Sequence, residues 1–306
     1  MSSFNDIILN ALKQKFVQIN PNVEFNTNMA SSQAQFYVQD LKYNLIESMG
    51  ESHIQQYKKG SGNELDSNMC ALKSSSAMTF NLLGNDSIVF KENLTIPGGR
   101  YHIEYEKQLH TLKAGRQPAN LDAQLLCPEN GVAVFCEMKM TEWLFNNPGV
   151  LKDKYLDPQN YIHSKSFEPF NKVFKALISD HINGANEHKS IYKRYDAFQM
   201  MKHILAIYNA VSSSEYDKFK KIILVNCVWE MSSPEILGTQ FSDKYREYYY
   251  QELSEFYNFK RKLKPVISLF KDLKVDFEII FISFDDFLKL SDKSRRQLDY
   301  LERYYI

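Results

Sequence analysis

The chain has few cysteines, no long apolar run and no net charge, and each lack argues against a class of protein. Four cysteines among 306 residues form no Cys-x-x-Cys pair, so neither a disulfide framework nor a zinc site is expected. No stretch approaches the roughly eighteen apolar residues that a membrane-spanning helix needs. The amphipathic opening segment lacks the apolar core and cleavage signal of a secretory leader. We expect a cytoplasmic protein with no membrane contact.

The balance of charge argues against a protein that coats nucleic acid without specificity. Lysine plus arginine and aspartate plus glutamate both number 37, whereas such a coat depends on a basic surface that neutralises phosphates. A locally basic groove remains compatible with this balance. No Gly-x-x-x-x-Gly-Lys-Ser/Thr loop is present, so the chain shows no sign of an ATP motor.

Two apolar segments with turn formers between them are the most informative feature that is present. Ala119–Cys127 (ANLDAQLLC) and Gly131–Met140 (GVAVFCEMKM) read as strands. The residues between them, Pro128, Glu129 and Asn130, lead into Gly131, and Asn-Gly before an apolar run favours a hairpin. We therefore predict an antiparallel pair here.

Three charged side chains interrupt this hairpin: Asp122, Glu137 and Lys139. Glu137 and Lys139 share one face because side chains alternate along a strand. A loop of two residues would place Asp122 opposite Lys139, and a loop of four would place it opposite Glu137. A loop of three would oppose Asp122 to Met138 and separate the charges.

The proximity of two carboxylates requires a physical explanation. At about 4 Å they repel by roughly 4 kcal/mol at an effective dielectric of 20. A Mg²⁺ ion reverses that sign, and a lysine beside it can orient a water and offset charge on a phosphoryl group. The alternative is an exposed hairpin edge, since Glu-x-Lys also recurs at Glu187–Lys189. The apolar run that leads into Glu137 favours a strand covered on both faces.

The chain resembles the PD-(D/E)XK nuclease superfamily, and more closely a group of uncharacterised bacterial restriction-endonuclease-like proteins. Asp122, fourteen intervening residues and Glu137-Met138-Lys139 match the motif, with Leu121 in place of its proline. Three further segments resemble the bacterial group, and the resemblance covers roughly residues 60–230. They are Gly62–Asp66 with Ala71–Ala77, Thr141–Leu144, and Tyr195–His203.

The resemblance implies an α/β fold with a restriction-endonuclease-like core, a central mixed β-sheet flanked by helices, here with extra helices. It also implies a Mg²⁺-dependent endonuclease, for which Mn²⁺ would substitute, acting on DNA and leaving a 5′-phosphate. Asp122, Glu137 and the backbone carbonyl of Met138 would hold the metal, and Lys139 would orient the attacking water. A restriction or phage-defence setting follows from the family alone.

Two more residues are candidates for the site. Glu64 begins a helix predicted over 64–83 and is either an additional metal ligand or a charge that favours the helix dipole; Glu47 is the fallback. Gln199 and His203 lie four residues apart on one helical face. We expect Gln199 to support the site and His203 to be a structural histidine.

We expect one nuclease-like domain over 1–306. It comprises a helical N-terminal extension (1–60), a nuclease core (60–230) and a C-terminal helical region with a final strand (231–306). A polar connection is predicted at 85–98 and irregular structure at 141–190. Helices are predicted at 4–18, 34–58, 64–83, 166–180, 191–211, 242–271 and 284–303. Strands are predicted at 101–109, 119–127, 131–140, 221–229 and 276–283.

Two other functions fit the same residues. One is a nuclease-like fold that binds nucleic acid or assembles with partners without cleaving. The other keeps the chemistry but acts on structured DNA or on RNA. A homodimer is compatible with either function.

Overall fold

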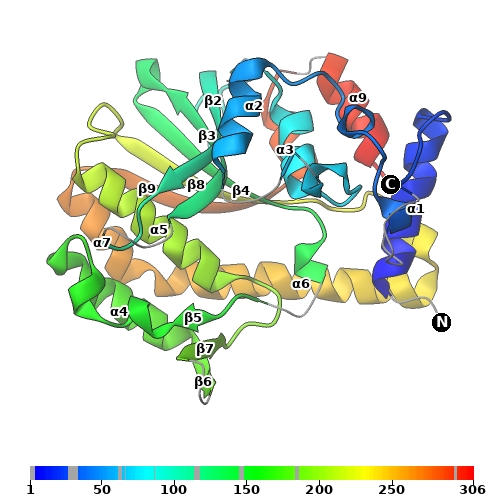
Figure 1. Cartoon of the computed structure of the whole chain (residues 1–306). Helices are drawn as coiled ribbons and strands as arrows, with labels where there is room; N and C mark the ends of the chain where they lie inside the picture. Colours follow the sequence, from blue (N-terminus) through cyan, green and yellow to red (C-terminus); the bar gives the residue numbers. More distant parts are fainter. Residues whose placement is uncertain are drawn as a thin grey trace.

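The computed structural model describes residues 4–26, 34–60, 64–65, 67–85, 87–113, 118–144, 148–182, 186–292 and 295–306. Its centre is a six-stranded sheet in the order β1-β2-β3-β4-β8-β9 (Figure 1). The strands are β1 (Ser87–Phe90), β2 (Gly99–Leu109), β3 (Ala119–Cys127), β4 (Val132–Lys139), β8 (Lys221–Val228) and β9 (Asp276–Ser283).

The sheet is mixed, as predicted. β1 to β4 pair antiparallel with their neighbours, whereas β4, β8 and β9 run parallel. Five of the six strands coincide with predicted strands. The sixth, β1, lies in the stretch predicted as a polar connection, because four residues are too few for a visible alternation.

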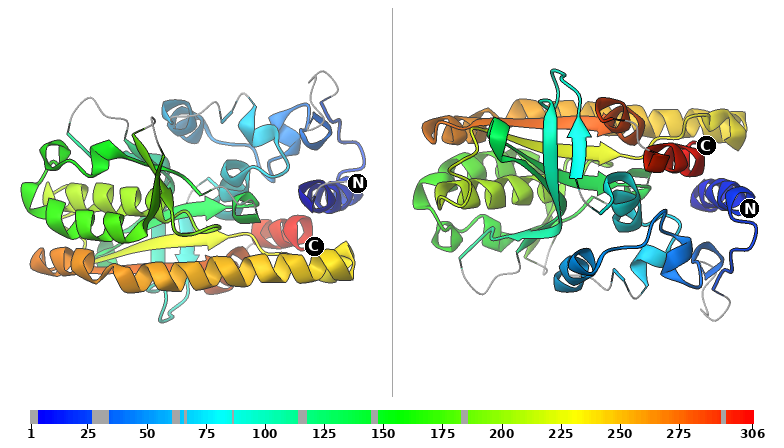
Figure 2. Two further views of the ribbon diagram at one scale, coloured as in Figure 1. Left: turned by 90° about the horizontal axis from the view of Figure 1, so that it is seen from below. Right: turned by 90° about the horizontal axis from the view of Figure 1, so that it is seen from above.

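Helices flank both faces of the sheet, which confirms the predicted fold class (Figure 2). One face is covered by α2 (Glu51–Lys59), α3 (Ser75–Leu83), α8 (Phe284–Leu290) and α9 (Arg295–Tyr304), and α1 (Phe4–Ile19) packs against α9. The other is covered by α4 (Phe167–Leu177), α5 (Ala197–Ser212), the C-terminal part of α6 (Thr239–Lys262) and α7 (Lys264–Asp272). No helix in these described ranges is long and apolar enough to cross a membrane.

Strand β4 is buried on both faces because apolar residues occupy both sets of alternating positions. Val134 and Cys136 pack into the cluster that contains α3, and Ala133 and Phe135 pack into the cluster that contains α5. A nearly continuous apolar run is typical of such a strand. Charged residues at its end therefore lie in a largely dehydrated place.

The β3–β4 connection sets the register of the hairpin. Pro128–Asn130 form a short 3-10 turn, and Gly131 follows in the left-handed region with φ +62°. Cys127 pairs with Val132 and Ala123 with Cys136. Continued by one residue, this register opposes Asp122 to Glu137, which is the predicted four-residue alternative.

Two helix predictions in the N-terminal third are wrong. The range 34–58 contains 3-10 turns at Ala34–Phe36 and Leu41–Tyr43 before α2 begins at Glu51. The helix predicted from Glu64 begins only at Ser75, because the Asn44 side chain donates to the carbonyls of Met69 and Ala71 and holds that segment away. The helix ends at Gly84, as predicted.

Residues 141–190 contain more regular structure than predicted. Besides α4 there is a second sheet of β5 (Leu151–Lys152), β7 (Glu187–Ser190) and β6 (Ile178–Ile182), in that order. This small sheet lies beside α4 (Figure 1), and Lys152 of β5 lines a cavity together with residues of α5.

The two ends of the chain pack against each other. Helices α1 and α9 lie side by side in both views of Figure 2. The Arg303 guanidinium donates to Oδ1 of Asn44 at 2.6 Å and lies 4.2 Å from the centre of the Phe16 ring. The predicted helix 242–271 divides into α6 and α7 just before Pro265, which the first turn of a new helix accommodates. The helix predicted at 284–303 likewise divides, into α8 and α9.

Candidate active site

Glu137, near the end of β4, is the centre of a cluster of polar side chains. It is 2% exposed. Its Oε1 lies 2.6 Å from Nζ of Lys139 and accepts a 2.8 Å hydrogen bond from Nε2 of Gln199. Its Oε2 lies 2.9 Å from Nε2 of His203, in a close contact without the alignment of a hydrogen bond. Oε1 thus faces one group from β4 and one from α5, and Oε2 faces a group from α5.

The start of α5 determines where Gln199 and His203 point. Asp196 caps this helix: one carboxylate oxygen accepts from the backbone N–H of Gln199 at 2.9 Å, and the other accepts from that of Gly149 at 3.0 Å. One turn separates Gln199 from His203, so both side chains reach the same carboxylate. Gln199 takes the place predicted for it. His203, expected to be merely structural, contacts the same group.

Asp122 reaches this cluster where the hairpin ladder ends. Beyond the pair of Ala123 and Cys136, Oδ2 of Asp122 accepts from the backbone N–H of Met138 at 2.6 Å. The carboxylate thereby accepts the hydrogen bond that a backbone carbonyl of a neighbouring strand would otherwise accept from that N–H. The structure therefore brings together Asp122, Glu137 and Lys139, as the hairpin pattern predicts.

The electrostatics of the three groups are interdependent. Burial and the neighbouring Glu137 raise the pKa of the Asp122 carboxyl well above its ordinary value. Burial also raises the pKa of Glu137, but Lys139 and His203 outweigh it and lower this pKa to about 2. Burial lowers the pKa of Lys139, and Glu137, Glu142 and Asp122 more than offset it, so the net shift is upward. Glu137 and Lys139 are thus a charged pair, and Asp122 is the carboxylate that lacks compensation.

Glu106 on β2 is a third carboxylate near the site, which the sequence analysis missed. Tyr105 pairs with Ala123 and Lys107 with Leu121, so Glu106 lies opposite Asp122, with φ +52°. Asn120 donates a hydrogen bond to it. Burial, together with the charges of Glu64 and Glu137, raises its pKa to about 7. Only the pairing of β2 with β3 reveals this position, because it brings Glu106 opposite Asp122.

Glu64 lies in a turn rather than at the start of a helix. Its Oε1 accepts from Nδ2 of Asn68 at 3.3 Å, and its charge acts on Glu106. Among the neighbours quoted for it in the sequence, Gly62, Asn63 and Asp66 lie outside the described residues. The fallback, Glu47, accepts from the backbone N–H of Asn85 at 3.0 Å.

Lys139 and Gln199 both line a small cavity of about 60 Å³. Glu252 of α6 lines it and is 2% exposed, and its Oε2 has no hydrogen-bond partner among the described residues. Burial and Glu255 raise the pKa of Glu252 well above its usual range, and Lys139 opposes this. The sequence gives no sign that Glu252 is buried, because the helix around it is rich in exposed polar residues as well as aromatic ones such as the buried Tyr245.

A comparison with the profiles of protein families shows to which family the chain belongs. Residues 11–304 match the profile of a family described as "Restriction Endonuclease associating with ARP". The chain belongs to this family. The predicted relationship to restriction endonucleases is thereby confirmed over nearly the whole chain. Searches of curated proteins and of solved structures found no significant match.

The residues of the site can be compared with what a divalent metal requires. No group of three His, Cys, Asp or Glu side chains within the described ranges is arranged to hold a metal ion. Asp122 and Glu137 nevertheless supply two hard oxygen ligands, a number that suits Mg²⁺, which keeps several waters and binds substrate phosphates. The raised pKa of Asp122 indicates a carboxylate whose negative charge a cation would stabilise.

Proposed function

We propose that the protein is a Mg²⁺-dependent phosphodiesterase, an endonuclease that hydrolyses DNA. The observation that carries this proposal is the meeting of Asp122, Glu137 and Lys139 at the end of β4, with Lys139 2.6 Å from Glu137. Family membership supports nuclease chemistry on DNA. The mixed sheet supports it as well, because it holds these three side chains on two paired strands.

Asp122, Glu137 and the backbone carbonyl of Met138 would hold the metal, and Mn²⁺ would substitute for Mg²⁺. Glu64 stays in the proposal as an outlying acidic ligand, since its charge already acts on Glu106. A bound divalent ion would supply positive charge to the phosphoryl oxygens and make a water more acidic.

Lys139 and Gln199 would have further roles in the reaction. The Lys139 ammonium would orient the attacking water and offset charge that develops on the phosphoryl group. Gln199 would hold the Glu137 carboxylate through its 2.8 Å hydrogen bond. The family implies in-line attack that leaves a 5′-phosphate and a 3′-hydroxyl.

The first experiment is cleavage of supercoiled plasmid in Mg²⁺ or Mn²⁺ by the wild type and by Asp122→Ala and Lys139→Ala. Lys189→Ala is the matched control, because Glu187–Lys189 repeats the Glu-x-Lys pattern on β7. We expect cleavage by the wild type and the control, and none by the two site variants or in the presence of chelator. Cleavage that survives in Lys139→Ala would contradict the assigned role.

The rival is a protein that binds nucleic acid without cleaving it. The balance of 37 basic and 37 acidic residues favours this reading. Absence of both cleavage and Mg²⁺ binding by calorimetry, together with binding of nucleic acid, would favour it over the nuclease. A parallel assay on structured DNA and on RNA distinguishes the substrate, and light scattering tests the homodimer. The family description names ARP as a partner with which its members associate. We propose that this protein associates with ARP as well.

A further inference from the structure

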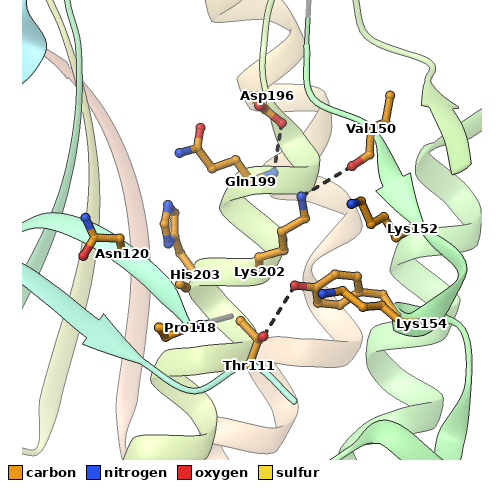
Figure 3. A pocket seen from close by; sticks show the side chains of 12 residues that line it. Thr111, Pro118, Asn120, Val150, Lys152, Lys154, Asp196, Gln199, Lys202 and His203 are labelled. Carbon is orange, nitrogen blue, oxygen red and sulfur yellow. Dashed lines mark hydrogen bonds between the residues drawn. The ribbon is translucent and has the colours of Figure 1, made fainter. Parts of the chain in front are cut away.

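A second, larger cavity of about 440 Å³ adjoins the candidate active site (Figure 3). Gln199 and His203, which contact Glu137, form part of its wall. Its remaining walls come from the segment before β3, from β5 and the turn that follows it, and from α5. They are Thr111, Pro118, Ala119, Asn120, Val150, Lys152, Lys154, Tyr155, Asp196 and Lys202.

Three lysines from two separate parts of the chain line this cavity. Lys152 ends β5, Lys154 lies in the 3-10 turn Asp153–Tyr155, and Lys202 lies on α5. In Figure 3 the Lys202 amino group points toward the Val150 carbonyl, with Lys152 and Lys154 on the same side of α5. Burial lowers the pKa of Lys202, and Lys154 and Lys152 lower it further. These cations therefore repel one another.

Among the described residues, the carboxylates nearby do not fully balance the charges of Lys152 and Lys202. Asp196 lines the cavity and raises the pKa of Lys202, but both of its oxygens already accept backbone hydrogen bonds, from Gln199 and Gly149. Glu187 lies 4.0 Å from Lys152, at the limit of an ion pair. The Lys202 amino group donates to the Val150 carbonyl at a long 3.4 Å. An anion with several acceptor oxygens would satisfy the amino groups of Lys152 and Lys202.

We propose that this cavity binds a phosphate group of the substrate strand, close to the phosphate that is cleaved at Asp122, Glu137 and Lys139. The proposal rests on the proposed function, since it places a second phosphate of the same substrate. Its position follows from the shared wall: Gln199 reaches Glu137 on one side and borders the lysine cavity on the other. Contacts of this kind set the register of a nucleic-acid backbone without reading its sequence.

The test measures binding of a DNA duplex with 5′-hydroxyl ends as a function of salt concentration. All proteins carry Asp122→Ala and are kept in chelator, so that cleavage does not enter the measurement. Lys152→Gln and Lys202→Gln are compared with Lys271→Gln, which removes an exposed lysine from α7. Lys152 is itself exposed, so its replacement leaves the core intact even if Lys202→Gln fails to fold.

We expect each cavity variant to bind more weakly and to lower the slope of log K against log salt by about 1, with no change in the control. Lys202→Arg should restore the slope. Slopes equal to the wild type in both cavity variants would overturn the proposal. That result is separable from failure of the proposed function, because the wild type would still cleave plasmid.

A second arm distinguishes a phosphate within the strand from one at its end. The same duplex is tested with 5′-phosphate ends. Equal affinity for both duplexes, with the loss in Lys152→Gln unchanged, supports a phosphate within the strand. A gain from the terminal phosphate that Lys152→Gln abolishes would overturn this form of the proposal and assign the cavity to strand ends.

Discussion

Nε2 of Gln199 donates a 2.8 Å hydrogen bond to Oε1 of Glu137, across 62 positions of sequence. This contact joins the start of α5 to the end of β4. The same Oε1 faces the Lys139 ammonium at 2.6 Å, so two donors hold one carboxylate oxygen. Glu137 is thereby held in one orientation before any substrate or metal arrives.

Replacing Gln199 with leucine should lower cleavage by roughly 10- to 100-fold, because residues that orient metal ligands have effects of that size. The fold should persist, since the helix cap at Asp196 uses the backbone N–H of residue 199. Plasmid cleavage rates at several Mg²⁺ concentrations provide the measurement. Gln55→Leu, an exposed glutamine on α2, is the control. Equal losses in both variants would contradict the assigned role.

Replacing Lys139 with methionine should destabilise the protein by about 3 kcal/mol, because Glu137 would remain buried without its counter-ion. The double variant with Glu137→Gln should lose less than the sum of the two single changes, since the uncompensated charge is then absent. Urea unfolding in chelator measures all three variants. Strict additivity would show that the pair does not interact.

Glu106 should make stability depend on pH. Its pKa is about 7 in the folded protein against an ordinary 4.5, so the folded state binds more protons than the unfolded chain between these values. Stability should therefore fall as pH rises from about 4.5 to 7, by up to roughly 3 kcal/mol. Glu106→Gln should flatten this decline, because the amide oxygen still accepts from Asn120 and carries no charge.

The measurement is urea unfolding of wild type and Glu106→Gln at pH 5, 6, 7 and 8 in chelator. Glu129→Gln, in the exposed turn between β3 and β4, is the matched control. A decline that is identical in all three proteins would place the titrating group elsewhere.

Gly131→Ala should cost about 1 kcal/mol, because φ +62° is unfavourable for a residue with a Cβ. The added Cβ would also lie 3.3 Å from the Lys218 carbonyl. Gly131→Asn should cost less, since asparagine tolerates this conformation better. Thermal unfolding of both variants tests the turn that sets the hairpin register. Equal costs would show that crowding, rather than backbone conformation, dominates.

The hairpin and its charged residues could be predicted because their determinants are local. The turn residues before Gly131 and the apolar run into Glu137 specify two strands whose connection allows few registers. Once the connection has four residues, Asp122 must oppose Glu137. The resemblance added Gln199, which the structure places against Glu137.

Other members of the site could not be predicted in this way. Glu106 joins Asp122 through the pairing of β2 with β3, and Glu252 approaches Lys139 only because α6 packs across the sheet. Helix starts were also misplaced where distant side chains intervened, as Asn44 does at Met69 and Ala71. Such contacts depend on tertiary packing, which overrides local propensity.

By itself, the sequence determined the strands of the mixed sheet other than β1, the hairpin with Asp122, Glu137 and Lys139, and the relationship to restriction endonucleases. The physical reason is that side-chain alternation and turn chemistry act over a few residues. Only the tertiary structure decided which distant groups surround that hairpin. His203 against Glu137 and the lysine cavity beside Gln199 arise from packing between segments that are far apart in sequence.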